Sequence, residues 1–168
     1  MKYFEANYKI VEGISEKNIE ELILFSRQDE EVLKFTGDRE RFANREKFNQ
    51  WCEKGRYIYT LVDQEGKLGG IVWLGEKEEA WTLAIRMYGV ARGRGWSYDF
   101  LSESMKKLME RKVFKTSMVK DWWLECSEDN MPARKLYEKM GFKLSGKGKE
   151  EGKIIYRRSH DFGSEKKN

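Results

Sequence analysis

The sequence is poor in residues on which many catalytic and structural sites depend: its 168 residues include one histidine, two cysteines and one proline. Since His160 is the only histidine, a histidine-rich metal site is excluded, and a histidine-dependent triad would rest on this one residue near the C-terminus. Cys52 and Cys126 stand far apart and form no CxxC pair, so we expect two reduced, packed thiols. The sequence therefore predicts neither metal nor disulfide chemistry.

Long apolar segments are absent as well. No run approaches the ~20 apolar residues that a membrane-spanning helix needs, and the first residues, MKYFEANYKI, are too polar for a signal peptide. We therefore expect a cytoplasmic protein without a membrane partner. Hydrophobic residues make up 39% and aromatic residues 14% of the chain, which is enough for a core and excludes a wholly disordered protein. The length predicts one domain over residues 1–160 and a flexible tail over 161–168.

The net charge of +4 comes from one end of the chain. Residues 143–168 contain eight Lys and Arg against four Asp and Glu, whereas the preceding 142 residues contain 25 of each sign. A basic nucleic-acid-binding domain usually concentrates its positive charge in a stripe, so this distribution disfavours nucleic acid as the ligand. We interpret the basic end as a solvated extension, able to attract an anionic partner.

The spacing of apolar residues predicts strands and helices of an α/β (α+β) domain. Runs of strand character lie at residues 3–11, 57–62, 68–74, 81–88, 122–126, 142–144 and 154–157. Helical spacing follows Gly13 and Ser15 and begins again at Ser97 and at Asn130. The acidic stretch 29–40 predicts loops around a short helix that ends near Trp51. Three consecutive antiparallel strands in the middle, followed by alternating strands and helices, indicate a sheet with helices on its faces.

The first segment with chemical character is R-G-R-G-W-S at residues 92–97, between a predicted strand and a predicted helix. Glycines let a backbone approach a ligand closely, and the N–H groups at a helix start favour an anion, above all a phosphate. Arg92 and Arg94 would add charge-assisted hydrogen bonds. The segment matches no Walker A loop, and Tyr98 stands where the third glycine of a dinucleotide loop belongs. Taken alone, it is equally typical of an ordinary basic turn, and a contact to RNA is a weaker third reading.

The second segment is N-M-P-A-R-K-L-Y-E-K-M-G-F at residues 130–142. Asn130 is a good helix N-cap and Pro132 suits a first helical turn. Tyr137 falls on the apolar face, so the local pattern alone indicates a core tyrosine with a satisfied hydroxyl. Gly141 fits the left-handed residue that ends many helices.

Together the two segments resemble the GCN5-related N-acetyltransferase (GNAT) superfamily. The acyl-CoA loop of that family follows R/Q-x-x-G-x-G/A; Arg92 and Gly95 match it, and Ser97 stands where Gly or Ala is usual. The pattern N-x-x-A-x-x-x-Y-x-x-x-G-F then follows after another strand, and the resemblance by element order covers about residues 56–157. It implies a single GNAT-like domain, whose mixed and largely antiparallel central sheet carries helices on both faces.

The resemblance implies acetyl-CoA as cosubstrate, no metal, and a site in which two neighbouring strands, 81–88 and 122–126, splay apart. It implies a cofactor-binding set of Ile85, Met87, Arg92, Gly93, Arg94, Gly95, Trp96, Ser97, Asn130 and Tyr137. Backbone groups of Ile85 and Met87 would pair with pantetheine, and the N–H groups of residues 93–97 would hold the pyrophosphate. Asn130 would lie beside the pantetheine. Tyr137 would act as general acid near the sulfur, and the Met87 N–H would stabilise the oxyanion.

The general base is open at this stage. Some family members use a Glu on the strand before the loop, where this chain has Trp81. Glu78, Glu79 and Glu125 are candidates, but the solvated reading is favoured for all three, and deprotonation through ordered water would need no dedicated base. Cys126 as a covalent acetyl carrier is disfavoured because no histidine lies near it to activate the thiol.

The leading hypothesis is therefore an N-acetyltransferase that transfers acetyl from acetyl-CoA to a primary amine by direct attack in a ternary complex. The acceptor is a small-molecule or a peptide amine, with a slight preference for the small molecule. Acidic residues in 29–40 are candidates to line its site, although such clusters on surface loops are usually solvated. The aromatic residues Trp51, Tyr57, Tyr59 and Trp73 are further candidates, although such residues more often build the core. The alternatives are a CoA-binding module without catalysis and, less favoured, a nucleic-acid-binding protein. Many GNAT relatives dimerise through sheet edges, and the sequence neither supports nor excludes a homodimer.

Overall fold

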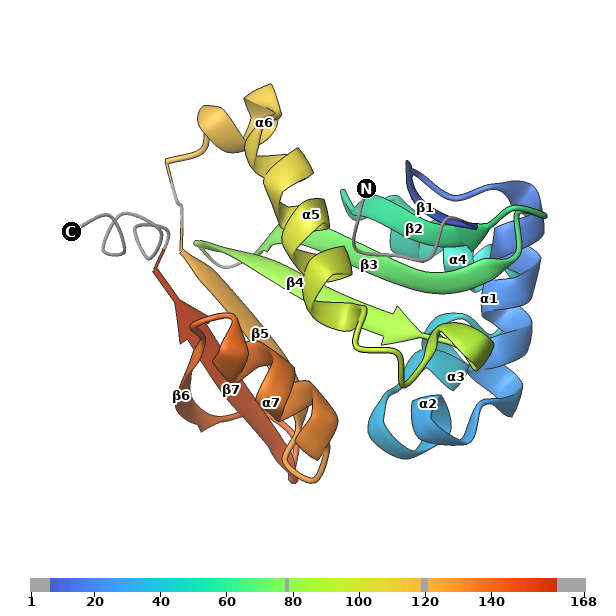
Figure 1. Cartoon of the computed structure of the whole chain (residues 1–168). Coiled ribbons are helices and arrows are strands. Elements are labelled where there is room, and N and C mark those ends of the chain that lie inside the picture. The colour runs from blue at the N-terminus through green and yellow to red at the C-terminus, as the bar shows by residue number, and fades with distance from the viewer. Residues whose placement is uncertain (1–6, 78, 119–120, 160–168) are drawn as a thin grey trace.

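The computed structural model describes residues 7–77, 79–118 and 121–159, which form one mixed sheet with helices on both faces (Figure 1). The strand order is β1-β2-β3-β4-β5-β7-β6. The strands are β1 (Tyr8–Glu12), β2 (Tyr57–Asp63), β3 (Leu68–Lys77), β4 (Ala80–Met87), β5 (Trp122–Ser127), β6 (Lys143–Lys147) and β7 (Lys153–Arg158). Every neighbouring pair is antiparallel except β4 and β5, which run parallel. The predicted fold class is thus confirmed.

The helices divide between the two faces of the sheet. One face packs against α5 (Ser97–Met109) and α7 (Met131–Lys139), and the other against α1 (Glu16–Gln28), α2 (Glu30–Phe35), α3 (Asp38–Arg41) and α4 (Arg45–Cys52). The short 3₁₀-helix η1 (Gly89–Ala91) precedes α5, and the short helix α6 (Lys112–Lys115) follows it. Strand β3 is buried on both sides: Val72 and Leu74 face the α5 side, while Ile71 and Trp73 face the α1–α4 side. Among the described helices, none has the length and apolar character needed to cross a bilayer.

Local sequence signals explain the helices that were predicted. The Ser15 side chain accepts a hydrogen bond from the Asn18 N–H and so caps α1. Leu101, Met105 and Leu108, spaced by four and three residues, form the buried stripe of α5. Gly141 has a φ of 88° directly after α7, as expected for a left-handed helix stop.

The prediction of loops over residues 29–40 is wrong, because this stretch folds into the short helices α2 and α3. The Asp29 side chain accepts a hydrogen bond from the Val32 N–H, which caps α2. Glu30 and Glu31 follow in the first turn, where negative charge favours a helix. The predicted first strand begins at Tyr8 in the structure, and residues 3–6 lie outside its described part. The acidic residues of this stretch therefore cap short helices or belong to them.

Candidate functional site

Strands β4 and β5 pair for only two residues and then separate. Their register is Trp81 with Trp122 and Thr82 with Trp123, and the Trp81 N–H donates to the Asp121 carbonyl at 2.8 Å. Beyond these pairs β5 continues antiparallel to β7, while β4 continues along β3 (Figure 1). The sheet is open at this place, and the predicted splay of the two strands is confirmed.

The splay leaves main-chain groups of β4 without a partner strand. The Trp81 N–H points toward β5, whereas the Tyr88 N–H donates to the Gly69 carbonyl on the β3 side at 2.9 Å. Because backbone direction alternates along a strand and the β3–β4 register is unbroken, the N–H groups of Ile85 and Met87 face the β5 side. They form an open edge of the kind that an extended ligand can pair with.

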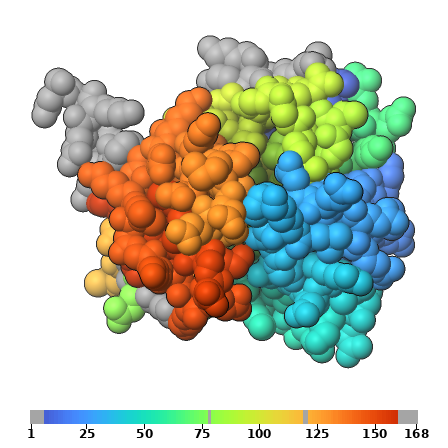
Figure 2. All heavy atoms as spheres, turned by 90° about the horizontal axis from the view of Figure 1, so that it is seen from below, coloured from blue at the N-terminus to red at the C-terminus, as the bar shows by residue number. Residues whose placement is uncertain are grey.

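A cavity of about 620 Å³ occupies the space between the separated strands. Seen from below, the surface is hollowed where α7, the loop before α5 and the blue α2 region meet (Figure 2). One half of its lining comes from the residues implied by the resemblance: Ile85, Met87, Arg92, Gly93, Gly95, Ser97, Asn130 and Tyr137. The other half comes from α2, the turn after it and α3 (Glu31, Val32, Phe35, Thr36, Gly37 and Arg41), from β3 and β4 (Trp73, Ala84 and Arg86), from β5 (Glu125, Cys126 and Ser127) and from the β6–β7 hairpin (Glu150 and Lys153). Pro132, Ala133 and Leu136 of α7 complete the lining.

The loop before α5 has the geometry of an anion site. Gly93 and Gly95 have φ angles of 77° and 75°, and both line the cavity. Helix α5 begins at Ser97 after Trp96, whose side chain makes no capping hydrogen bond. The first N–H groups of a helix have no acceptor within the helix, so they stay available to an anion.

The arginines of this loop are engaged with protein groups. Arg92 donates from one terminal nitrogen to both Asp29 oxygens at 2.9 Å and to the Met87 carbonyl at 2.8 Å, and its Nε lies 3.1 Å from a Glu31 oxygen. Arg94 is exposed and donates to the Val90 carbonyl at 2.7 Å. Direct phosphate contact by either arginine stays a prediction.

The predicted role of Trp96 can concern its backbone only. Its indole is 7% exposed, belongs to the core under α5 and packs against Tyr8 with ring centroids 4.9 Å apart.

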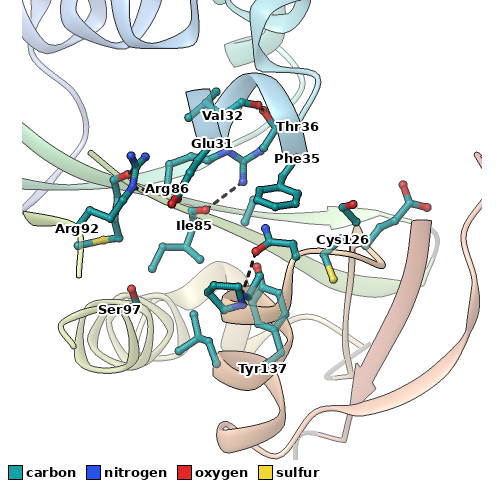
Figure 3. A pocket seen from close by; sticks show the side chains of 18 of the residues that line it. Glu31, Val32, Phe35, Thr36, Ile85, Arg86, Arg92, Ser97, Cys126 and Tyr137 are labelled. Atoms are coloured by element: carbon teal, nitrogen blue, oxygen red, sulfur yellow. Dashed lines mark hydrogen bonds and ion pairs between the residues drawn. The ribbon is translucent and has the colours of Figure 1, made fainter. Parts of the chain in front are cut away.

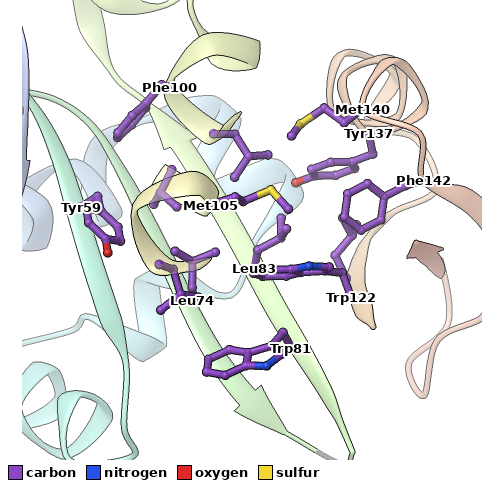
Figure 4. Packing of buried hydrophobic residues seen from close by; sticks show 14 of the residues in the cluster. Tyr59, Leu74, Trp81, Leu83, Phe100, Met105, Trp122, Tyr137, Met140 and Phe142 are labelled. Atoms are coloured by element: carbon purple, nitrogen blue, oxygen red, sulfur yellow. The ribbon is translucent and has the colours of Figure 1, made fainter. Parts of the chain in front are cut away.

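Tyr137 and Asn130 both lie on the cavity wall, at α7. Asn130 accepts a hydrogen bond from the Ala133 N–H at 3.3 Å, so it is the predicted N-cap of this helix. Tyr137 is only 4% exposed, and in Figure 3 its side chain rises from α7 into the cavity. Figure 4 shows the same ring beside Met140 and Phe142, as the core interpretation requires. Burial raises the pKa of Tyr137 to about 12, so its hydroxyl keeps its proton at neutral pH.

Cys126 lies on the wall near Tyr137 but is not an activated nucleophile. Burial raises the pKa of its thiol to about 11, and the neighbouring Arg134 and Lys153 only partly offset this effect. The thiol therefore stays protonated at neutral pH, which agrees with the prediction of a packed side chain.

The three carboxylates considered as general base differ in position. Glu78 lies outside the described residues. Glu79 occupies the turn before β4 with a φ of 65° and is not part of the cavity lining. Glu125, on β5, lines the cavity, whereas Trp81 is fully buried in the core. Of the three, only Glu125 is brought to the site within the part of the chain that the structure describes.

A buried ion-pair network on the opposite wall was missed by the sequence analysis. Asp38 at the start of α3 is 0% exposed and accepts hydrogen bonds from Arg86 Nε at 2.6 Å, from Arg86 Nη2 at 3.1 Å and from Arg41. Burial acts to raise the pKa of Asp38, but the charges and hydrogen bonds of the two arginines outweigh it and hold the pKa below its usual value. A signal was present, because Arg86 interrupts an otherwise apolar strand and a buried charge requires a partner.

Comparison with known proteins agrees with this geometry. Residues 10–143 match the family model described as acetyltransferase (GNAT) domain. No curated protein matches the sequence significantly. Among solved structures, ribosomal-protein-S5-alanine acetyltransferase from Vibrio fischeri superposes with a TM-score of 0.71 at 16% identity, covering 95% of this chain and 96% of that chain. Spermidine N-acetyltransferase from Vibrio cholerae, in complex with CoA and spermine, gives a TM-score of 0.68 at 16% identity over 91% of this chain and 94% of that chain. A domain from Methanocaldococcus jannaschii gives 0.66 at 21% identity, over 91% of this chain and 99% of that chain.

Proposed function

Because the chain belongs to the GNAT acetyltransferase family, we propose that it transfers the acetyl group of acetyl-CoA to a primary amine by direct attack while both substrates are bound. One arrangement carries the proposal: the open edge of β4, the uncapped start of α5 and the Tyr137 side chain border the same cavity. The open edge of β4 would pair with the extended cofactor arm, and the start of α5 would bind the pyrophosphate. The Tyr137 hydroxyl would lie near the leaving thiol.

The residues present fit the parts of acetyl-CoA. When bound, it supplies an acetyl group activated as a thioester. The N–H groups of Ile85 and Met87 would hold the pantetheine arm, because they face the splay without a partner strand. The N–H groups of residues 93–97 would hold the pyrophosphate, with the two left-handed glycines letting the backbone approach it. Asn130, which starts α7 at the cavity, would lie beside the arm.

Two groups of this chain would assist the acyl transfer. The Met87 N–H would donate to the carbonyl oxygen on which negative charge develops. The Tyr137 hydroxyl would give its proton to the departing sulfur, and its raised pKa ensures that the proton is present at neutral pH. A donor with so high a pKa is effective only when it is held in place, and the packing of its ring against Phe142 and Tyr156 provides this.

Glu125 is our candidate for the group that accepts the proton of the amine. It lines the cavity and lies on β5 next to Cys126. It would act directly or through one ordered water. Replacement of Glu125 by Gln keeps the shape and removes the basic oxygen, so it should lower kcat more at low pH than at high pH, where the amine is already neutral.

A small-molecule amine is the acceptor we favour. The acceptor half of the cavity is bounded by α2 on one side and by Glu150 and Lys153 on the other, and Lys153 Nζ donates to the Phe35 carbonyl across it at 3.1 Å. This hydrogen bond narrows the acceptor half of the cavity and leaves less room for a long peptide. The Vibrio cholerae neighbour was solved with spermine, another small amine. A homodimer through the edge strands β1 or β6 stays a prediction.

Calorimetric titration with acetyl-CoA tests the proposal. The wild-type protein should bind one acetyl-CoA per chain, and Gly95→Glu should abolish binding because it puts negative charge where the pyrophosphate would lie. Gly55→Glu is the matched control: Gly55 has a φ of 77°, like Gly95 it has open space around its Cα, and it lies outside the cavity lining. Both variants carry the same backbone strain, so a difference between them reports the site. If the folded wild-type protein binds neither acetyl-CoA nor longer acyl-CoAs, the proposal fails and RNA becomes the next ligand to test.

A further inference from the structure

Arg41 and Arg86, both held by the buried Asp38, line a part of the cavity that acetyl-CoA binding does not require. We propose that Arg41 and Arg86 bind a carboxylate of the acceptor, so that the acceptor is a small amino acid or a similar compound with a primary amine and a carboxylate. This inference rests on the proposed acetyl transfer and specifies its second substrate.

The first argument is charge. Asp38 is one carboxylate facing two guanidiniums, so the network as a whole carries one excess positive charge. Arg86 has a side chain that is only 16% exposed, and Arg41 is 37% exposed; both line the cavity. A partly buried excess charge is favourable only when a counter-charge is near it. An anionic group of a ligand in the cavity would supply that charge.

The second argument is the supply of hydrogen-bond donors. Arg86 uses Nε and Nη2 on Asp38 and Nη1 on the Ile85 carbonyl, so described residues occupy three of the five N–H groups of a guanidinium. Arg41 uses one terminal nitrogen on Asp38. The remaining N–H groups lie in fixed planes, because both guanidiniums pack on the Trp73 ring, at 5.7 Å for Arg41 and 4.8 Å for Arg86. Fixed planar donors suit a carboxylate rather than an ammonium.

The other charges around the cavity agree with a ligand that carries both signs. Asp29 and Glu31 share Arg92, so this neighbouring cluster carries one excess negative charge, but the Glu31 side chain is 60% exposed and solvent screens it from the network. Lys153 donates to a neutral carbonyl and adds no negative charge. Glu125 and Glu150 line the wall that lies across the splay on the β5–β7 side. An amine placed toward Glu125 and a carboxylate placed toward Arg86 would match both walls. A polyamine would instead leave the arginines facing like charge.

The test compares three matched acceptors: an amino acid, its carboxamide and the corresponding decarboxylated amine. The set is repeated for an aromatic, an aliphatic and a basic side chain, and spermidine is added as a polyamine. Release of the CoA thiol gives kcat/KM for each compound. For the preferred side chain, the amino acid should exceed its carboxamide by about ten- to a hundredfold, as expected when hydrogen bonds to a charged group are lost. In Arg41→Gln and Arg86→Lys this ratio should fall toward one. Arg45→Gln, which removes an exposed arginine paired with Glu16 outside the cavity, should leave the ratio unchanged.

A binding measurement separates this inference from the proposed function. Both guanidiniums pack on the Trp73 ring, so a carboxylate bound to them should change the fluorescence of Trp73, and Trp73→Phe should remove that change. If the amino acid changes the Trp73 fluorescence but is not acetylated in the presence of acetyl-CoA, the proposed transfer is contradicted and the carboxylate site is supported. If the amino acid and its carboxamide have equal kcat/KM, and their ratio is unchanged in Arg41→Gln and Arg86→Lys, the carboxylate site is overturned and the proposed transfer is supported. Absence of both the fluorescence change and the preference would also overturn it.

Discussion

Arg92 binds both carboxylate oxygens of Asp29 at 2.9 Å and thereby joins the loop before α5 to the start of α2. Arg92 lines the half of the cavity that would hold the cofactor, and Asp29 caps α2, which borders the acceptor half. The same guanidinium donates to the Met87 carbonyl, so it also fixes the end of β4. This contact suggests that Arg92 supports the phosphate site by ordering its backbone.

Two variants distinguish a supporting Arg92 from one that binds phosphate directly. If Arg92 acts through its carboxylate partner, Arg92→Met and Asp29→Asn should weaken acetyl-CoA binding by similar factors, about three- to tenfold. Each should also lower the free energy of unfolding by about 1 kcal/mol, as partly buried ion pairs do when broken. Calorimetry and thermal unfolding measure both effects. Strong weakening by Arg92→Met alone, with a reduced salt dependence of binding, would instead identify a direct phosphate contact.

Tyr137→Phe is expected to remove catalysis while keeping the cofactor. The ring packs in the core and the hydroxyl borders the cavity, so phenylalanine preserves the packing and removes the proton donor. We expect kcat to fall about a hundredfold or more, with the Kd for acetyl-CoA within about twofold of the wild-type value. Steady-state kinetics and calorimetry check this expectation. Unchanged kcat would show that Tyr137 is a core residue only, and lost turnover with retained binding would disfavour a non-catalytic CoA-binding module.

Buried acids near the cavity should make the protein less stable at alkaline pH. Burial raises the pKa of Cys126 from 9.0 to about 11, so the protonated thiol is favoured in the folded state. Its contribution is fully present below pH 9 and is lost as the pH rises through 11, because the unfolded chain gives up the proton first. Between these pH values, the decrease in the free energy of unfolding should be ~1–2 kcal/mol smaller in Cys126→Ser than in the wild-type protein. Denaturant unfolding at pH 8 and pH 10.5 measures it. Cys52→Ser is the comparison: burial also raises the pKa of this half-buried α4 thiol, so its replacement should act in the same direction but by less, because the thiol is more exposed than that of Cys126. Parallel curves for wild type and Cys126→Ser would rule out this origin of the pH dependence.

Sequence predicts best what local patterns encode. The stripe of Leu101 and Met105 defines α5, and the order of loop and α7 motifs locates the cofactor half of the cavity. Helices α2 and α3 were missed because they are short and bury little: within α2 only Val32 is buried. The pairing of Arg86 with Asp38 joins residues 48 positions apart, and nothing local indicates which acid lies opposite a strand arginine. The acceptor half is thus a product of tertiary packing.

The last prediction concerns Gly148, which precedes β7 and lies against the Glu125 carboxylate. A Cβ added at Gly148 would overlap a Glu125 oxygen and would lie 2.7 Å from the Lys153 Cβ, closer than side chains normally approach. The end of the Glu125 side chain can swing aside, whereas the Lys153 Cβ is fixed to the β7 backbone, so Gly148→Ala should shift the β6–β7 turn, lower stability and move the Glu125 carboxylate away from its position on the cavity wall. If Glu125 accepts the proton of the amine, kcat should fall about tenfold or more, with little change in acetyl-CoA binding.

Gly146→Ala is the matched control for this experiment, because Gly146 lies in the adjoining strand β6 and a Cβ there meets no atom within 4 Å. It should leave kcat and stability unchanged. Steady-state kinetics of both variants and of Glu125→Gln measure the effect. If Gly148→Ala and Glu125→Gln lower kcat by similar factors, the position of that carboxylate matters to proton transfer. If both variants keep the wild-type kcat, Glu125 is not the base, and deprotonation through ordered water remains as the route that needs no carboxylate.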